Sequence, residues 1–166
     1  PPRSTLFPYT TLFRSRKQVY IGGNFRLDED EAMVIDISDG GASYFVVPTG
    51  NVWGTTFDIA GRTSSLNKAQ SVPNDDGSYT FVLSRRDPGV HNWIDPCGSA
   101  DGILTLRMAE FPDGRPNDDL GAKSRVVPLS GLRSELPAET KWVTEAERID
   151  QLAQRSAAYR RRLPES

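Results

Sequence analysis

The chain has 166 residues, with 20 Lys and Arg against 22 Asp and Glu, so its formal net charge at pH 7 is −2. This acidic balance argues against a general nucleic-acid binder and against a binder of anionic membranes. No apolar run approaches the roughly 20 residues that a membrane-spanning helix needs. Because the chain has one Cys and one His, an intrachain disulfide and any metal site needing two imidazoles are excluded.

The first fifteen residues, PPRSTLFPYTTLFRS, are interpreted as the in-frame translation of a sequencing-library adapter, not native protein. Such a segment is set aside in fold reasoning. Without Arg3 and Arg14, the native part has 18 basic and 22 acidic residues, a net charge of −4. We expect a β-domain over 16–136, truncated at its N-terminus, followed by a C-terminal extension over 137–166. A missing N-terminal domain of the same protein is its expected partner.

Period-two alternation and β-branched residues predict several strands along the chain. They are QVYIGG (18–23), EAMVIDIS (31–38), SYFVVPTG (43–50), VWGTTFDI (52–59), SYTFVLS (78–84) and ILTLRMA (103–109), with a short edge strand SRVVPLS (124–130). Gly, Pro, Asn and Asp are frequent between them, which is typical of turns. A spacing of about ten residues, with no helical pattern between the strands, predicts an all-β fold, either an antiparallel sandwich or an open barrel.

The region 51–70 carries two secondary candidates for a functional site. Trp53 and Phe57 share a parity in the predicted strand 52–59, so both are predicted to face the core. Trp53 and Asn67 are secondary site candidates.

The acidic run DEDE (28–31) is interpreted as a solvated turn, because it lacks the alternating oxygen ligands and the glycine of a calcium loop.

The C-terminal extension is predicted to contain a helix over about 145–163. Thr144 and Glu147 form the capping-box pattern T-x-x-E at its start. A thin apolar stripe is expected to pack along the sheet or a partner chain, and consists of Ile149, Leu152, Ala153, Ser156 and Tyr159.

The densest group of chemically capable residues lies in DPGVHNWIDPCG (87–98) and the strand after it. In a functional interpretation six residues line a pocket: Asp87, His91, Asn92, Trp93, Asp95 and Arg107. His91 would then act as a general base with Asp87 or Asp95 in a hydrolytic enzyme. Asp87, His91 and Asp95 lie four residues apart, which on a helix would suggest a metal site. Because two prolines and a glycine forbid a regular helix here, this spacing does not predict one. No cofactor is indicated.

The structural interpretation of the same residues fits more of them. Trp93 would close one end of the sandwich, while Asn92 and the aspartates bond their own loop backbone. Arg107 would pair with Asp95 or Asp87 in a partly buried ion pair, since buried charges are normally paired.

The order of several short motifs resembles the bacterial domain of unknown function 1214. The motifs are Ser65–Leu66–Asn67, Asp76–Gly77–Ser78, Asn92–Trp93–Ile94, Gly102 and Leu106–Arg107. This resemblance implies a jelly-roll-like β-sandwich at the C-terminal end of a larger protein, with no established catalytic residues. The leading hypothesis is therefore a structural or small-ligand-binding module, and the alternative is the hydrolytic enzyme.

Overall fold

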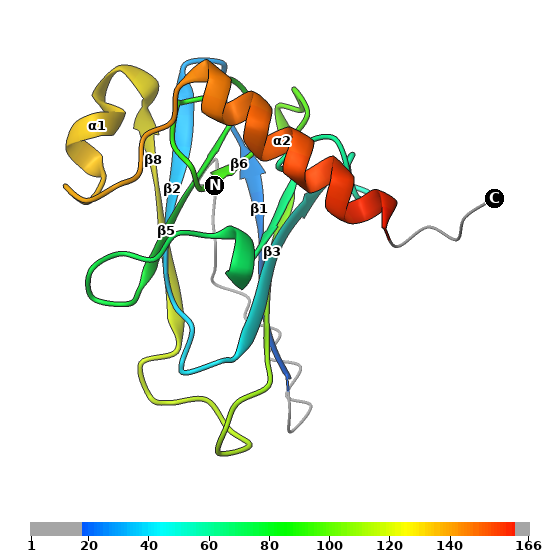
Figure 1. Cartoon of the computed structure of the whole chain (residues 1–166). Coiled ribbons are helices and arrows are strands. Elements are labelled where there is room, and N and C mark those ends of the chain that lie inside the picture. The colour runs from blue at the N-terminus through cyan, green and yellow to red at the C-terminus, as the bar shows by residue number, and fades with distance from the viewer. Residues whose placement is uncertain (1–17, 162–166) are drawn as a thin grey trace.

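The computed structural model describes residues 18–161, which form two four-stranded sheets packed face to face (Figure 1). The first sheet has the order β1 (Gln18–Arg26), β7 (Asp101–Ala109), β3 (Tyr44–Gly50), β4 (Ser65–Asn67). The second has the order β6 (Trp93–Ile94), β5 (Tyr79–Ser84), β2 (Glu31–Ser38), β8 (Gly121–Pro128). The predicted all-β sandwich with a C-terminal helix is confirmed. Segment 1–15, which is predicted to derive from an adapter, lies outside the described residues.

Four short helical elements complete the described chain: η1 (Lys68–Gln70), η2 (Leu129–Gly131), α1 (Leu132–Glu135) and α2 (Glu145–Arg160). Helix α2 crosses one end of the sandwich (Figure 1). The predicted capping box begins it, because Thr144 Oγ1 accepts from Glu147 N at 3.3 Å and Glu147 Oε2 accepts from Thr144 N at 2.7 Å. The predicted helix end near residue 163 lies outside the described residues.

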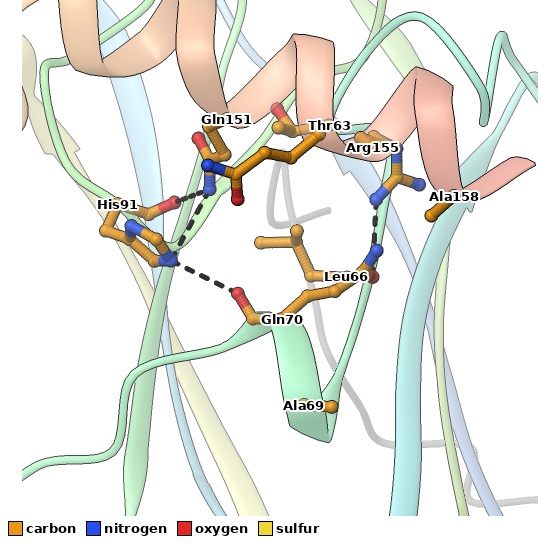
Figure 2. Close-up of a pocket in the computed structure, with 9 residues that line it drawn as sticks. Thr63, Leu66, Ala69, Gln70, His91, Gln151, Arg155 and Ala158 are labelled. Atoms are coloured by element: carbon orange, nitrogen blue, oxygen red, sulfur yellow. Dashed lines mark hydrogen bonds between the residues drawn. The ribbon is translucent and has the colours of Figure 1, made fainter.

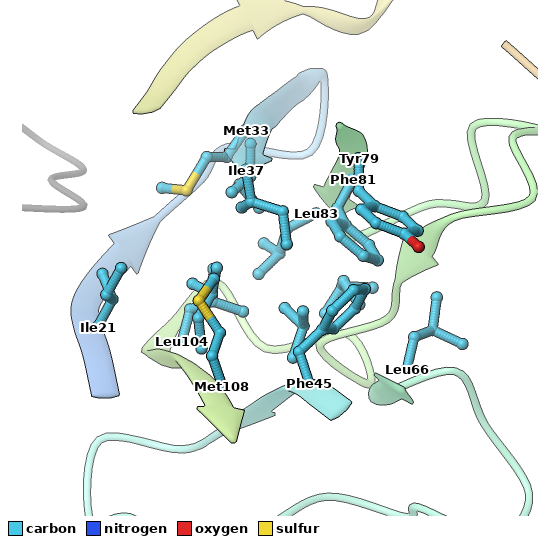
Figure 3. Packing of buried hydrophobic residues seen from close by; sticks show 14 of the residues in the cluster. Ile21, Met33, Ile37, Phe45, Leu66, Tyr79, Phe81, Leu83, Leu104 and Met108 are labelled. Carbon is cyan, nitrogen blue, oxygen red and sulfur yellow. The ribbon is translucent and has the colours of Figure 1, made fainter. Parts of the chain in front are cut away.

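The main core fills the space between the two sheets (Figure 3). Alternate residues of the facing strands point into it, as the period of a β-strand requires. Phe45 packs edge-on against Tyr79, with ring centroids 4.7 Å apart, and against Phe81 at 6.2 Å. The aliphatic part of the core includes Ile21, Met33, Ile35, Leu66, Leu83, Leu104, Leu106 and Met108.

The second sheet is also covered on its outer face. Val34, Val82 and Trp93 on that face belong to a separate apolar cluster, together with residues of the segment that follows β8. That segment contributes Leu132, Leu136 and the half-buried Trp142. Because both faces are covered, all six residues of β5 are buried.

Two strand predictions were wrong in extent or kind. Segment 52–59 is a loop, since Asn51 Oδ1 accepts from the backbone N–H of Trp53 and of Thr55, each at 3.0 Å, and Gly54 has φ +78°. This turn leaves Trp53 86% exposed, so it does not face the core. Strand β8 begins at Gly121, earlier than predicted, and ends at Pro128.

The short strands β4 and β6 were not predicted. Strand β6 pairs with β5 in parallel, whereas every other strand pair in the described chain is antiparallel. The backbones of β7 and β3 approach closely where Gly102 lies, because a Cβ there would meet Gly50 O at 2.3 Å and the Phe25 ring at 2.7 Å. Only glycine fits this position without movement of its neighbours.

Candidate functional site

Asp87 opens the segment 87–98 and pairs with a residue of α2. Its carboxylate receives the Arg148 guanidinium in a bidentate contact, with Nε to Oδ2 at 2.8 Å and Nη2 to Oδ1 at 3.1 Å. The backbone N–H of Gly89 also donates to Oδ1, at 2.8 Å. Buried Arg148 donates in addition to the Val90 carbonyl and lies 5.1 Å from the Trp93 ring centroid. This contact fixes α2 against the loop.

Asp95 pairs with a different arginine, which precedes β4. It is 2% exposed, and its Oδ2 accepts from Arg62 Nε at 2.7 Å. Its Oδ1 accepts from the backbone N–H of Cys97 at 2.7 Å, which forms a tight turn. Burial raises the pKa of the Cys97 thiol, so this residue is not a ready thiolate nucleophile.

Asn92 and Trp93 have structural partners. The Asn92 amide binds both backbone groups of Val72, at 2.9 Å and 2.8 Å, and the Thr80 carbonyl at 3.1 Å. Trp93 is buried as predicted, and its Nε1–H donates to the Ser84 carbonyl at 3.0 Å. The side-chain bonds of Asn92 thus join the loop to Val72 and Thr80, not to its own loop backbone as predicted.

The predicted pair between Arg107 and Asp87 or Asp95 is wrong, because both carboxylates are taken by Arg148 and Arg62. Arg107 alternates with Leu106 and Met108, which face the main core, so its side chain lies on the outer face of the first sheet. There its guanidinium lies 5.8 Å from the Tyr20 ring centroid, and its buried Nε has no hydrogen-bond partner among residues 18–161. The segment 87–98 belongs to the second sheet.

His91 faces neither predicted carboxylate. Its Nε2 lies 3.2 Å from the Gln70 carbonyl and 3.5 Å from the Gln151 amide nitrogen, and donates to that carbonyl in the tautomer that carries the proton on Nε2. Gln151 Nε2 donates to the His91 carbonyl at 3.2 Å. Burial is the main cause that lowers the pKa of His91, so the ring is neutral at pH 7. Within residues 18–161, no hydrogen bond joins His91 to Asp87, Asp95, Ser84 or Cys97.

A cavity of about 280 Å³ lies between α2 and the segment from Thr63 to Gln70 (Figure 2). Of the predicted site residues, only His91 lines it. Polar lining groups come from Thr63, Gln70, His91, Gln151, Gln154 and Arg155. Leu66, Ala69 and Ala158 supply apolar walls. None of the described residues that line the cavity carries a carboxylate.

Asn67 positions one wall of this cavity. Its Oδ1 accepts from Gln70 N at 3.0 Å, and Gln70 Oε1 accepts from Asn67 N at 3.1 Å, so the two form a capping box at η1. Gln70 Oε1 also accepts from Arg155 Nη1 at 3.3 Å. The secondary candidate Asn67 is thus a helix cap that orients a cavity residue, whereas Trp53 is not among the cavity residues.

Arg155 is 5% exposed and is the charged group of the cavity. Its Nε donates to the Ile59 carbonyl at 2.6 Å, and burial lowers its pKa. Among the described residues, no carboxylate forms an ion pair with it. A buried guanidinium is strongly stabilised by an anion, which makes this cavity suited to a polar or negatively charged molecule.

Sequence reasoning missed the face of α2 that forms this cavity. Arg148, Gln151 and Arg155 follow helical spacing and point toward the sandwich, while Ile149 of the predicted apolar stripe is 60% exposed. Ala153 is also exposed, but Leu152, Ser156 and Tyr159 are half-buried and Ser156 Oγ donates to the Ala60 carbonyl at 3.0 Å, so the stripe prediction was wrong only in part. The spacing signal was present, but burial of two arginines depends on carbonyl and carboxylate partners far away in the sequence.

The described part of the chain offers no group of three or more His, Cys, Asp or Glu side chains that could hold a metal ion. It also contains no helix that is long and apolar enough to cross a membrane.

No family model and no curated protein matches the chain. Two solved structures resemble it. An uncharacterised protein from Burkholderia cenocepacia is 27% identical, with a TM-score of 0.62 over 72% of this chain and 32% of that chain. The VPA0106 protein from Vibrio parahaemolyticus is 16% identical, with a TM-score of 0.50 over 68% of this chain and 31% of that chain, and shares the fold alone. This chain spans about a third of the length of each.

Proposed function

We propose that this chain is a non-catalytic β-sandwich module that binds a small ligand in the cavity beneath α2. The observation that carries the proposal is buried Arg155, a cation that lines the cavity and has no ion-pair partner among residues 18–161. Ligand sites combine apolar walls with a few polar groups that fix orientation. Leu66, Ala69 and Ala158 supply such walls here, and the arginine and amides supply the polar groups.

The arrangement of His91 favours binding over hydrolysis. A general base must reach the proton that it removes and needs an orienting group. Here Nε2 faces the Gln70 carbonyl, while Asp87 and Asp95 are engaged by Arg148 and Arg62. The alternative of a hydrolytic enzyme built on His91 with either aspartate has no geometric support.

We further propose a jelly-roll-like connectivity and kinship with the bacterial domain of unknown function 1214. The motif order around Asn92–Trp93–Ile94 and Leu106–Arg107 supports this kinship. The matched part of this chain covers only 32% and 31% of the similar solved structures, which agrees with a module of a larger bacterial protein. Its partner would be the N-terminal part of that protein.

The binding proposal is tested by proton–nitrogen NMR titration with a panel of neutral, cationic and anionic probes: acetamide, methylammonium, acetate and butyrate. We expect at least one probe to shift the signals of Thr63, Gln70 and Gln151. Ala158→Phe should abolish the shifts, because it fills the cavity from α2. Ala157→Phe is the matched control, since Ala157 is exposed on the same helix and does not line the cavity. Absence of shifts with every probe, or unchanged binding in Ala158→Phe, would contradict the proposal.

A further inference from the structure

We infer that the ligand of the cavity beneath α2 is a small organic carboxylate held by the Arg155 guanidinium, an inference that rests on the proposed binding function. The cavity is lined by one guanidinium, by uncharged polar groups and by apolar side chains, and by no acidic residue. The neutral imidazole of His91 adds no negative charge. The described lining therefore carries one positive charge and no negative one.

Two arginines on the same face of α2 differ in whether a carboxylate binds them. Arg148 and Arg155 are both buried and lie seven residues apart, which is two helical turns. Arg148 has a bidentate carboxylate partner in Asp87. Within the described residues, Arg155 has a backbone carbonyl at 2.6 Å, the Gln70 amide oxygen at 3.3 Å and the Tyr159 ring centroid at 5.6 Å, but no carboxylate. An incoming carboxylate would give Arg155 the partner that Arg148 already has.

Asp58 acts on Arg155 by its charge, but one of its carboxylate oxygens serves its own turn. Burial lowers the pKa of Arg155, against the smaller, raising effects of the charges of Tyr159 and, to a still smaller extent, of Asp58. Its Oδ1 accepts from the backbone N–H groups of Ala60 and Gly61, at 3.1 Å and 2.8 Å, and so caps its own turn. No ion pair joins Asp58 to Arg155 in the described chain.

Thr63 gives a second, independent indication of a ligand. Its side chain is fully buried, lines the same cavity, and its Oγ1 has no hydrogen-bond partner in the part of the chain that the structure describes. A buried hydroxyl without a partner is costly, and a carboxylate oxygen would accept its proton. Thr63 and Arg155 are therefore two hydrogen-bond donors in the lining of the same cavity.

The walls select an organic anion over an inorganic one. Leu66, Ala69 and Ala158 leave apolar surface in a cavity of about 280 Å³. An alkyl chain would cover this surface, whereas phosphate would leave it unfilled. A molecule with a carboxylate head and a short aliphatic tail matches both parts of the cavity.

The test compares three probes on the intact chain by NMR titration: butyrate, butyramide and inorganic phosphate. Butyramide has the shape of butyrate without its charge. We expect butyrate to bind at least about tenfold more tightly than butyramide, the effect of a hydrogen bond to a charged group. Phosphate should bind more weakly than butyrate.

Variants locate the interaction. Arg155→Met should weaken butyrate binding about tenfold or more, whereas Arg160→Met, an equal change of charge at an exposed position of α2, should leave it unchanged. Thr63→Val keeps the shape of the side chain and should also weaken butyrate more than butyramide. It serves as the second variant should Arg155→Met release α2, which the amide signals of the helix would report.

Equal binding of butyrate and butyramide would overturn the carboxylate inference and leave the binding proposal standing. Phosphate binding more tightly than butyrate would also overturn it, in favour of an inorganic anion site. Binding of methylammonium alone would overturn it in favour of a cation. Failure of every probe would overturn the inference and the proposed function together.

Discussion

The space between the two sheets and the interface beneath α2 bury different kinds of side chain. Between the sheets, Phe45, Phe81 and Leu104 meet other apolar groups and no charge. Beneath α2, Arg148 and Arg155 meet carbonyl oxygens, the Gln70 and Gln151 side chains and one carboxylate. One region is stabilised by removal of apolar surface from water, and the other by directional polar contacts.

This difference has a consequence for where a ligand can bind. An apolar core is close-packed and leaves no unpartnered polar group. A helix held by arginines and amides places polar atoms at fixed points, and one of its contacts, at Arg155, lacks the carboxylate that its counterpart at Arg148 has. The polar interface rather than the core is therefore the place where a small molecule adds stability.

The largest effect is expected from breaking the core. Phe45→Ala should lower the free energy of unfolding by about 3–5 kcal/mol, because it removes a buried aromatic ring that packs on Tyr79 and Phe81. Denaturant unfolding measures this change. Trp53→Ala is the control, since its 86% exposed ring should change stability by no more than about 0.5 kcal/mol. A comparable loss of stability in both variants would mean that the loop carrying Trp53 is part of the core.

A smaller effect is expected from breaking the polar interface. Arg148→Met should cost about 1–3 kcal/mol, less than a fully buried pair, because the Asp87 side chain is 36% exposed and water screens it. The double-mutant cycle with Asp87→Ala should show coupling above about 0.5 kcal/mol.

Two controls sharpen this cycle. Arg107→Met combined with Asp87→Ala should be additive, since Arg107 lies on the other sheet. Ile149→Ala should change stability by at most about 0.5 kcal/mol, because this apolar residue of α2 faces solvent. A strong loss in Ile149→Ala would mean that α2 is held by apolar packing after all.

The smallest effect is a pH dependence at His91. Burial lowers its pKa, with smaller contributions in the same direction from the charges of Lys141 and Arg148. As pH falls through the ordinary histidine pKa near 6.5, the unfolded chain binds a proton that the folded chain does not, so the folded state loses stability. His91→Gln should remove this loss between about pH 7.5 and 5.5, as measured by thermal unfolding across that range. A parallel pH profile in wild type and variant would contradict the assignment.

Strands with clear period-two patterns were predictable from the sequence. Segments 31–38 and 78–84 match β2 and β5 closely, because alternation and β-branched residues act locally. The prediction at 52–59 failed since local turn chemistry, Asn51 with Gly54, outweighed the alternation around it. The two-residue strand β6 is too short to leave a pattern, and its pairing with β5 depends on tertiary structure.

The candidate site was predictable only in part. The capping box at Thr144 is a local signal and was found. The partner of each aspartate depends on which arginine the fold brings near, and Arg62 and Arg148 lie 33 and 61 residues away from Asp95 and Asp87. Strand parity placed Arg107 on one side of its sheet but could not indicate which sheet carries the loop 87–98.

The polar attachment of α2 also bears on how the chain moves. Local opening costs least where few apolar contacts must be broken, and such units exchange their amide hydrogens before the rest of a protein unfolds. Its hydrogen bonds toward 59–70 and 87–91 are made by the side chains of Arg148, Gln151, Arg155 and Ser156, whereas β5 is buried along its whole length. We therefore expect the amides of α2 to exchange before those of β5, so that a ligand could enter the cavity when the helix opens and both sheets stay folded.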